Sequence, residues 1–214
     1  MKLLIVAATQ MELLPLPTST EGRRWGVDVL IAGVGMLATA YALTRHLQAN
    51  RYDLVLQVGV GGSFNRDIPL GSVVFVTTDQ YGDLGAEDHD AYIDIFDMGL
   101  LDKDITPHTG GKLVTPLLPI HEKIALPQAS AITVNTVSGN ESTILRRSKR
   151  YNADIESMEG AAFHYVCLQE GVAFAQVRAI SNYVIPRDKS QWTMKDAIIN
   201  LNKWMACFIE KLNA

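Results

Sequence analysis

Three polar residues with useful chemistry stand directly at the ends of apolar segments. Glu12 follows the first apolar run, Glu159 opens an apolar helical pattern, and Asn182 follows another apolar run. A carboxylate can take a proton from water or stabilise a positive charge, and an amide offers both a donor and an acceptor. Each alone also has an ordinary interpretation, as a loop carboxylate, a favourable charge at a helix N-terminus or a turn residue. All three nevertheless fall where α/β proteins bind ligands, outside the carboxyl ends of strands.

Two glycine-rich segments are candidate ligand-binding turns. Gly33-Val34-Gly35-Met36-Leu37-Ala38 fits the dinucleotide fingerprint, and Asp53 lies 20 residues after its first glycine. That fingerprint should follow the first strand, with its acid at the end of the second, whereas Asp53 precedes its strand. We therefore interpret the segment as a tight turn that lets a helix pack close to the sheet. Gly59-Val60-Gly61-Gly62 ends a predicted strand and is either a plain turn or a place where backbone N–H groups approach a ligand.

Other catalytic patterns are not found in the sequence. The five histidines and two cysteines show no metal-ligand spacing, so we predict no metal and no cofactor. The acidic stretch Asp79–Gly99 lacks the EF-hand pattern and is interpreted as a solvated long loop or lid. No serine nucleophile elbow and no Walker A loop occur.

Apolar periodicity predicts the elements that position these residues. Six strands are expected, at Lys2–Ala8, Val27–Ala32, Leu54–Val58, Ser72–Thr77, Ala131–Val137 and Ala173–Ile180. Three helices are expected, at Met36–Leu47, Glu159–Glu170 and Thr193–Leu212, with Gly171 ending the second and Thr193 able to cap the third. This pattern predicts an α/β fold with a mixed central β-sheet sandwiched by helices. No linker or repeat is visible, so residues 1–214 are expected to form one domain.

Composition excludes several classes of protein. The chain has 214 residues, of which 48% are hydrophobic and 20% charged, and its formal net charge of −4 lacks the basic excess of nucleic-acid-binding proteins. No apolar run reaches the ~18 residues of a membrane span. The apolar start is interpreted as a strand rather than a signal peptide, because Gln10 and Glu12 follow at once. Cys167 and Cys207 are expected to be buried free thiols, which fits a cytoplasmic protein.

Taken in order, these segments resemble the purine nucleoside phosphorylase and nucleosidase superfamily over nearly the whole chain. The similarity is carried by the Glu12 loop, the two glycine-rich segments, Ser157-Met158-Glu159-Gly160-Ala161-Ala162 and Val177-Arg178-Ala179-Ile180-Ser181-Asn182. Within it the chain most resembles the futalosine hydrolases, by Tyr81–Asp88, Ser138–Ser142 and Ser181–Trp192. The methylthioadenosine/adenosylhomocysteine nucleosidases are less similar. They typically read Val-Glu-Met-Glu and Ile-Ser-Asp, where Ser157 and Asn182 stand here.

The resemblance implies a nucleoside phosphorylase-like three-layer fold and hydrolysis of an N-ribosidic bond. Glu12 would be the base that activates water on the ribose face opposite the purine. Glu159 would accept hydrogen bonds from the ribose 2′- and 3′-hydroxyls, and Met158 would pack against the sugar. For a futalosine hydrolase the products would be hypoxanthine and dehypoxanthine futalosine, a step of menaquinone biosynthesis.

The leaving purine would meet a second group of residues. Asn182 would accept from a protonated N7 and donate to a 6-oxo group, which suits hypoxanthine, although a flipped amide could serve adenine. By the same resemblance Val60, Gly61 and Ser181 would contribute to substrate binding. The residue that stacks on the purine stays unassigned.

Alternatives remain within the superfamily. A methylthioadenosine/adenosylhomocysteine nucleosidase and a non-catalytic nucleoside-binding member are both open. A phosphorylase is disfavoured, because Val60 follows Gly59, residues 1–22 hold no arginine, and an anionic Glu12 would repel phosphate. The expected partners are a small purine nucleoside and water, with no nucleic acid and no membrane. The resemblance alone implies a homo-oligomer, and Arg187 and Lys189 are candidates for binding the futalosine carboxylate.

Overall fold

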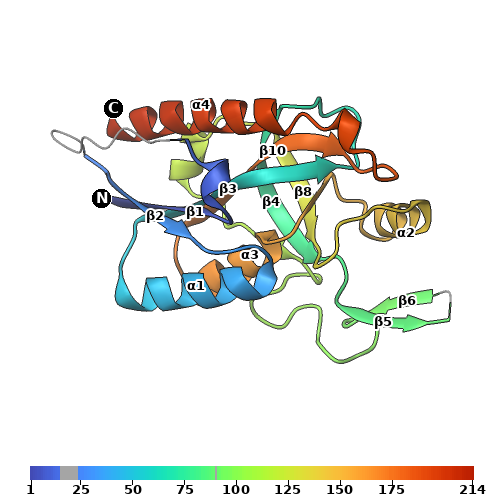
Figure 1. Ribbon diagram of the computed structural model, residues 1–214. Coiled ribbons are helices and arrows are strands. Elements are labelled where there is room, and N and C mark those ends of the chain that lie inside the picture. Colours follow the sequence, from blue (N-terminus) through green and yellow to red (C-terminus); the bar gives the residue numbers. More distant parts are fainter. Residues whose placement is uncertain (15–23, 90) are drawn as a thin grey trace.

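The computed structural model describes residues 1–14, 24–89 and 91–214 (Figure 1). The main sheet contains the strands β1 (Lys2–Ala7), β2 (Gly26–Ile31), β3 (Leu54–Ser63), β4 (Val73–Tyr81), β7 (Leu113–Val114), β8 (Gln128–Thr133), β9 (Ile155–Ser157) and β10 (Phe174–Tyr183). The helices are α1 (Met36–Ala49), α2 (Glu141–Tyr151), α3 (Gly160–Gln169) and α4 (Met194–Asn213). Short 3-10 turns lie at η1 (Gln10–Glu12), η2 (Pro119–Lys123) and η3 (Lys189–Gln191).

The main sheet closes on itself at one end. Its order is β10-β4-β8-β9-β3-β1-β2, β7 pairs with β4, and β10 also pairs with β3. The strands β3, β10, β4, β8 and β9 therefore form a ring, from which β1 and β2 extend. The β10–β4 and β3–β9 pairs are antiparallel and the β1–β2, β1–β3 and β10–β3 pairs are parallel, which confirms the predicted mixed sheet.

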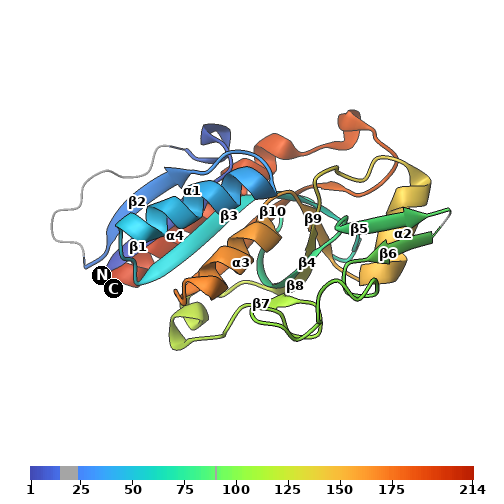
Figure 2. The ribbon, with the colours of Figure 1, turned by 90° about the horizontal axis from the view of Figure 1, so that it is seen from below.

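Helices cover both faces of the sheet, as the apolar pattern predicts. The side chains of β1 alternate between the faces: Leu3 and Ile5 pack in the core with α4, and Leu4 and Val6 pack in the core with α1 and α3. Figure 1 shows α4 along one face and α1 with α3 along the other, and Figure 2 shows α1 and α3 side by side. The predicted sandwich is confirmed.

Several predicted elements differ in detail. Gly59-Val60-Gly61-Gly62 is not a turn but part of β3, because β10 and β9 pair with the strand there. The expected acidic loop begins within β4 and contains a hairpin of β5 (Gly85–Asp88) and β6 (Ala91–Asp94). The strand expected at Ala131–Val137 ends at Thr133. Sequence analysis missed α2, which carries few apolar residues.

The predictions for the ends of α3 and α4 and for the two cysteines are only partly confirmed. Gly171 has a φ of +63° and follows Glu170, the C-cap residue of α3, as expected of a helix terminator. Thr193 stands at the start of α4, but its hydroxyl donates to the Ser181 carbonyl instead of capping the helix. Cys167 is buried as expected, whereas Cys207 is exposed. Within the described ranges, no helix is both long and apolar enough to cross a membrane.

Candidate active site

A cavity of about 350 Å³ opens where the carboxyl ends of β1, β3 and β10 meet, and we call it the active-site cavity. All seven site residues expected from the sequence line it: Glu12, Val60, Gly61, Met158, Glu159, Ser181 and Asn182. Much of the remaining wall is apolar and consists of Ala8, Met11, Val34, Val137, Trp192, Met194 and Ile198. A mostly apolar cavity with a few convergent polar groups is the usual form of a small-molecule site.

Glu12 is held by backbone donors. Its Oε2 accepts from the N–H of Thr9 (3.0 Å) and its Oε1 from the N–H of Val60 (3.4 Å). The side chain of Asn202 in α4 anchors this loop, because its Nδ2 donates to the Glu12 carbonyl (2.9 Å) and its Oδ1 accepts from the N–H of Leu14 (2.9 Å). The position of the carboxylate therefore depends on β3 and α4 together, and its charge has no cation among these partners.

Glu159 is fixed from two sides at the start of α3. Its Oε1 accepts from the N–H of Gly35 (3.0 Å), and its Oε2 lies 3.5 Å from Arg178 Nη1. Gly33 and Gly35 have φ values of +90° and +89°, and a Cβ on Gly33 would lie 2.9 Å from the Cβ of Ala38. The segment is the tight turn that sequence analysis favours, and its N–H group also orients the carboxylate.

Arg178 is a site residue that sequence reasoning missed. Its side chain is 1% exposed, its Nη2 donates to Gln57 Oε1 (3.0 Å) and its Nη1 donates to the Val60 carbonyl (3.4 Å). A Cβ on Gly59 would lie 2.5 Å from Arg178 Nη1 and 2.9 Å from Glu12 Oε1. Only a glycine lets both groups approach the strand here. The available signal was an arginine within the apolar run of a buried strand, where an unpaired charge is not tolerated.

Asn182 stands at the end of β10. Its Oδ1 accepts from Ser181 Oγ (2.9 Å), and its Nδ2 donates to the Tyr183 carbonyl (3.0 Å). A Cβ on Gly62 would lie 3.1 Å from this Nδ2, so glycine again makes room for a side chain over β3. The amide keeps one N–H and one oxygen lone pair for a ligand.

Glu156 and Trp192 also line the active-site cavity, and sequence analysis assigned no role to either. Glu156 is buried and pairs with Arg147 (3.1 Å), so its charge is compensated. The Arg187 guanidinium carbon lies 5.3 Å from the ring centre of Trp192. Trp192 lines the active-site cavity, whereas Arg187 does not; both line a smaller cavity of about 60 Å³, which shares Asn182 with the active-site cavity. Lys189 lines neither of these two cavities.

These contacts define what the arrangement can do chemically. Glu159 pairs with Arg178, whereas the recorded side-chain partners of Glu12 are backbone N–H groups, so the three groups together carry net negative charge. In an apolar cavity such charge stabilises a cation that develops on a bound molecule. In the described part of the chain, no three histidine, cysteine, aspartate or glutamate residues group as a metal site would require.

Comparison with known proteins gives concordant matches. The model of the Phosphorylase superfamily matches residues 20–212. A futalosine hydrolase from Streptomyces coelicolor is 32% identical over 82% of this chain and 75% of its own length. A 5′-methylthioadenosine/S-adenosylhomocysteine nucleosidase from Actinobacillus succinogenes is 30% identical over 76% of this chain and 71% of its own length.

Solved structures match over almost the entire chain. An MTA/SAH nucleosidase from Colwellia psychrerythraea, in complex with adenine, aligns with a TM-score of 0.79 at 18% identity, covering 99% of this chain and 96% of that one. A futalosine hydrolase of Helicobacter pylori aligns with a TM-score of 0.77 at 16% identity, covering 98% and 97%. At these identities the structural matches show the fold.

Proposed function

The chain belongs to the Phosphorylase superfamily, and from that premise we propose that it is a nucleosidase that hydrolyses the N-ribosidic bond of futalosine. One observation carries the proposal: Glu12, Glu159 and Asn182 line a single apolar cavity. Glu12 precedes residues 20–212, which the family model matches, so the geometry of the cavity supports its role independently.

The proposed reaction transfers the ribosyl group from the purine to water. As the bond between C1′ and the purine N9 breaks, its electron pair leaves with the base and C1′ becomes positive. The water oxygen attacks C1′ and gives its proton to Glu12. Glu159 accepts hydrogen bonds from the ribose hydroxyls, and the net negative charge of the cavity favours the cationic transition state. The purine takes a proton from solvent at N7 as it leaves, and Glu12 returns its proton to solvent after the attack. The N7–H donates to Asn182 Oδ1, and Nδ2 donates to the 6-oxo group.

Charge favours water over phosphate as the second reactant. The N–H of Val60 is engaged by Glu12, and the guanidinium of Arg178 is engaged by Glu159. An anion entering beside Glu12 would meet a carboxylate instead of a free cation. We therefore propose a hydrolase and not a phosphorylase.

The second candidate is a methylthioadenosine/adenosylhomocysteine nucleosidase, supported by the relative at 30% identity that carries this name. Asn182 favours the futalosine hydrolase, because a neutral amide can serve a 6-oxopurine without first binding a proton. Arg187 shares its small cavity with Asn182, so it is expected beside the base and not beside a carboxylate attached through C5′.

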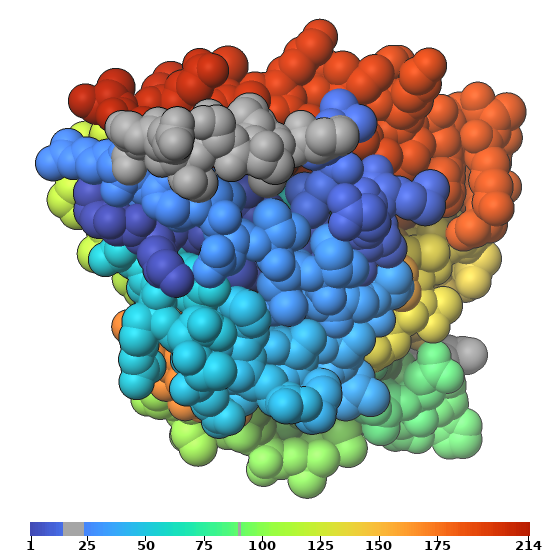
Figure 3. Space-filling model, turned by 60° about the vertical axis from the view of Figure 1, so that its left-hand side comes forward, coloured from blue at the N-terminus to red at the C-terminus, as the bar shows by residue number. Residues whose placement is uncertain are grey.

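We also propose that the working enzyme is a homo-oligomer in the cytoplasm. Met11 and Val34 line the active-site cavity and are 82% and 58% exposed, and Leu37 and Tyr41 of α1 are 86% and 64% exposed. Figure 3 shows the face on which α1 lies, below α4. A second copy of the chain on this face would cover apolar surface at the mouth of the cavity. Sedimentation equilibrium tests this, and a monomer at micromolar concentration would contradict it.

The decisive experiment incubates the protein with futalosine, inosine and methylthioadenosine in phosphate-free buffer and follows the free base by chromatography. We expect hypoxanthine from futalosine alone. Adenine from methylthioadenosine would favour the second candidate. Release of base only after phosphate is added would contradict the hydrolase proposal and indicate a phosphorylase.

A further inference from the structure

A buried polar cluster adjoins the active-site cavity without lining it. Its members are Asp79, His164 and Gln176, each with 0% exposure. They come from three different elements, β4, α3 and β10. Buried polar side chains are costly unless they are hydrogen-bonded, so such a cluster needs a physical reason.

Gln176 is the centre of this cluster. With its carbonyl oxygen towards Arg178, Oε1 accepts from Arg178 Nε (3.1 Å), while the amide nitrogen donates to Asp79 Oδ2 (3.2 Å) and His164 Nε2 (2.8 Å). The opposite orientation would place NH₂ against an arginine N–H, so the hydrogen-bond network defines the orientation. His164 Nδ1 lies 3.2 Å from the Leu113 carbonyl, which leaves Nε2 as the acceptor. Burial lowers the pKa of His164 to about 3 and keeps the ring neutral.

Gln176 completes the hydrogen bonding of Arg178. Arg178 Nη2 bonds to Gln57, and Nη1 faces the Val60 carbonyl and Glu159. The remaining nitrogen, Nε, has Gln176 as its partner. A planar guanidinium held at all three nitrogens has one orientation, and that orientation aims Nη1 at Glu159.

The same cluster also reaches the first turn of α3. Asp79 Oδ1 accepts from Thr133 Oγ1 (2.8 Å), which in turn accepts from the N–H of Ala161 (2.7 Å). Any Cβ on Gly160 would collide with Asp79 Oδ2 and with the Gln176 amide. The glycine that directly follows Glu159 therefore lets the cluster approach the active-site backbone. Burial raises the pKa of Asp79 to about 7, even though this carboxyl accepts several hydrogen bonds.

We propose that Gln176 is a positioning residue of the active site: it fixes the guanidinium of Arg178 and thereby the carboxylate of Glu159. The kinetic test of this inference rests on the proposed function, whereas the positioning of Arg178 and Glu159 rests on geometry. A displacement of about 1 Å in a catalytic arrangement can cost about 10²-fold in rate. A residue that only fills the core would affect rate through stability alone.

The test uses two substitutions with opposite consequences. Gln176→Met keeps the length of the side chain but removes the acceptor for Arg178, and we expect kcat for futalosine to fall by about 10²-fold with KM within about threefold. Gln176→Glu keeps an oxygen for Arg178 but faces Asp79, so we expect a lower melting temperature with kcat within about fivefold of the wild type. Val177→Ala is the matched control, because Val177 is buried on the same strand but packs in the core with α4. It should lower the melting temperature and leave kcat unchanged.

Each outcome decides the proposal. If kcat follows the melting temperature across all three variants, Gln176 is structural and the proposal is wrong. If the wild type releases base from none of the nucleosides, the proposed function fails instead. A crystal structure of the Gln176→Met variant then tests positioning alone, and an unchanged Arg178–Glu159 contact would overturn it.

Discussion

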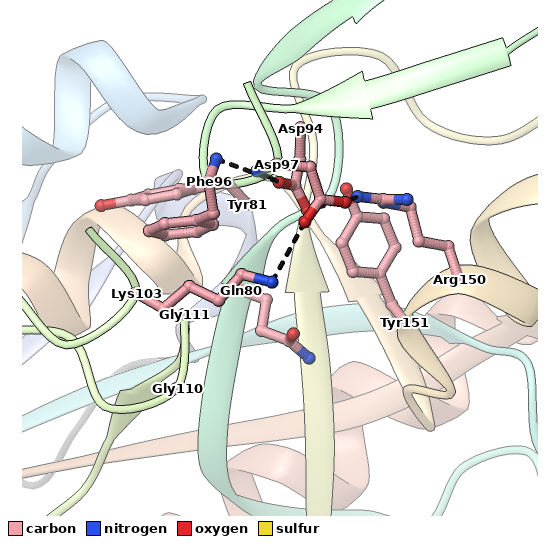
Figure 4. A pocket seen from close by; sticks show the side chains of 10 residues that line it. All are labelled: Gln80, Tyr81, Asp94, Phe96, Asp97, Lys103, Gly110, Gly111, Arg150 and Tyr151. Carbon is pink, nitrogen blue, oxygen red and sulfur yellow. Dashed lines mark hydrogen bonds and ion pairs between the residues drawn. The ribbon is translucent and has the colours of Figure 1, made fainter. Parts of the chain in front are cut away.

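Two of the cavities in the described part of the chain differ in how their charged side chains are paired. In the active-site cavity, Glu12 and Glu159 accept hydrogen bonds from backbone N–H groups, and Glu159 alone pairs with the buried Arg178. We call the second cavity, of about 260 Å³, the hairpin cavity (Figure 4). Its lining is Gln80, Tyr81, Asp94, Phe96, Asp97, Lys103, Gly110, Gly111, Arg150 and Tyr151.

The hairpin cavity cancels its own charge. Arg150 Nη2 bonds to Asp94 Oδ2 (2.6 Å) and also to Asp97, and Lys103 Nζ bonds to Asp97 Oδ1 (3.0 Å). Two carboxylates thus face two cations, and these bonds connect α2 with the hairpin and the turn after it. The active-site cavity has one more carboxylate than cations among Glu12, Glu159 and Arg178. The difference lies in charge compensation: the hairpin cavity balances its charges, and the proposed active site does not.

The strongest test of this contrast compares one carboxylate from each cavity. Glu12→Gln removes the group that accepts the water proton, and we expect kcat to fall by about 10³-fold with nucleoside binding retained. Asp97→Asn in the hairpin cavity should leave kcat within about twofold. Steady-state kinetics with calorimetric binding measures both. Normal turnover by Glu12→Gln would refute the mechanism.

The next test concerns the backbone beneath the charges. Gly59→Ala places a methyl group 2.5 Å from Arg178 Nη1 and 2.9 Å from Glu12 Oε1, so both side chains must move. We expect kcat to fall by about 10²-fold. Gly26→Ala on β2 is the control, because its nearest non-neighbouring atom would be 4.0 Å away. If Gly59→Ala and Gly26→Ala have equal activity, the close approach at Gly59 has no catalytic importance.

The sequence predicts the sandwich because buried strands have unmistakable apolar runs, and Lys2–Ala8 and Leu54–Val58 are examples. It does not predict that β3 continues through the glycines to Ser63, because that extension depends on pairing with β9 and β10, far away in the chain. The same long-range pairing closes the ring of strands. Local periodicity carries no information about it.

Some residues of the candidate site could likewise be predicted from the sequence, and others could not. Glu12, Glu159 and Asn182 were predicted because strand ends and the family resemblance point to them, and all three line the same cavity. Arg178 was missed, although a charged residue within an apolar strand is a visible sign of a buried partner. The contribution of Trp192 had no local sign, because it reaches the cavity from the segment just before α4.

A smaller effect is expected for the choice of base. Asn182→Asp replaces a neutral amide with a group that must bind a proton before it can donate. We expect the ratio of kcat/KM for futalosine to that for methylthioadenosine to fall by about tenfold, which corresponds to about 1.4 kcal/mol. Ser181→Ala is the comparison, since it removes a donor to Asn182 Oδ1 without changing the amide. An unchanged ratio in Asn182→Asp would mean that Asn182 does not determine which purine base is preferred.

The smallest effect belongs to the hairpin cavity and concerns stability. Arg150→Met keeps part of the packing on Tyr92 and Tyr151 but removes the cation shared by Asp94 and Asp97. Arg150 is 26% exposed, so we expect a loss of about 2–4 °C in melting temperature at neutral pH and an unchanged kcat. A large loss of kcat would show that the two cavities are coupled.

The stabilisation that Arg150 provides in the hairpin cavity should depend on pH. Hydrogen bonds from Arg150 and then Lys103 hold the pKa of Asp97 below its ordinary value. The unfolded chain protonates Asp97 near pH 4, so the pairing stabilises the fold fully above about pH 4 and its contribution is lost as pH falls through the lower folded-state pKa. The melting temperatures of the wild type and Arg150→Met should therefore differ most at neutral pH and converge in acid. A gap that widens below about pH 4 would show that the charges of the hairpin cavity do not stabilise by mutual pairing.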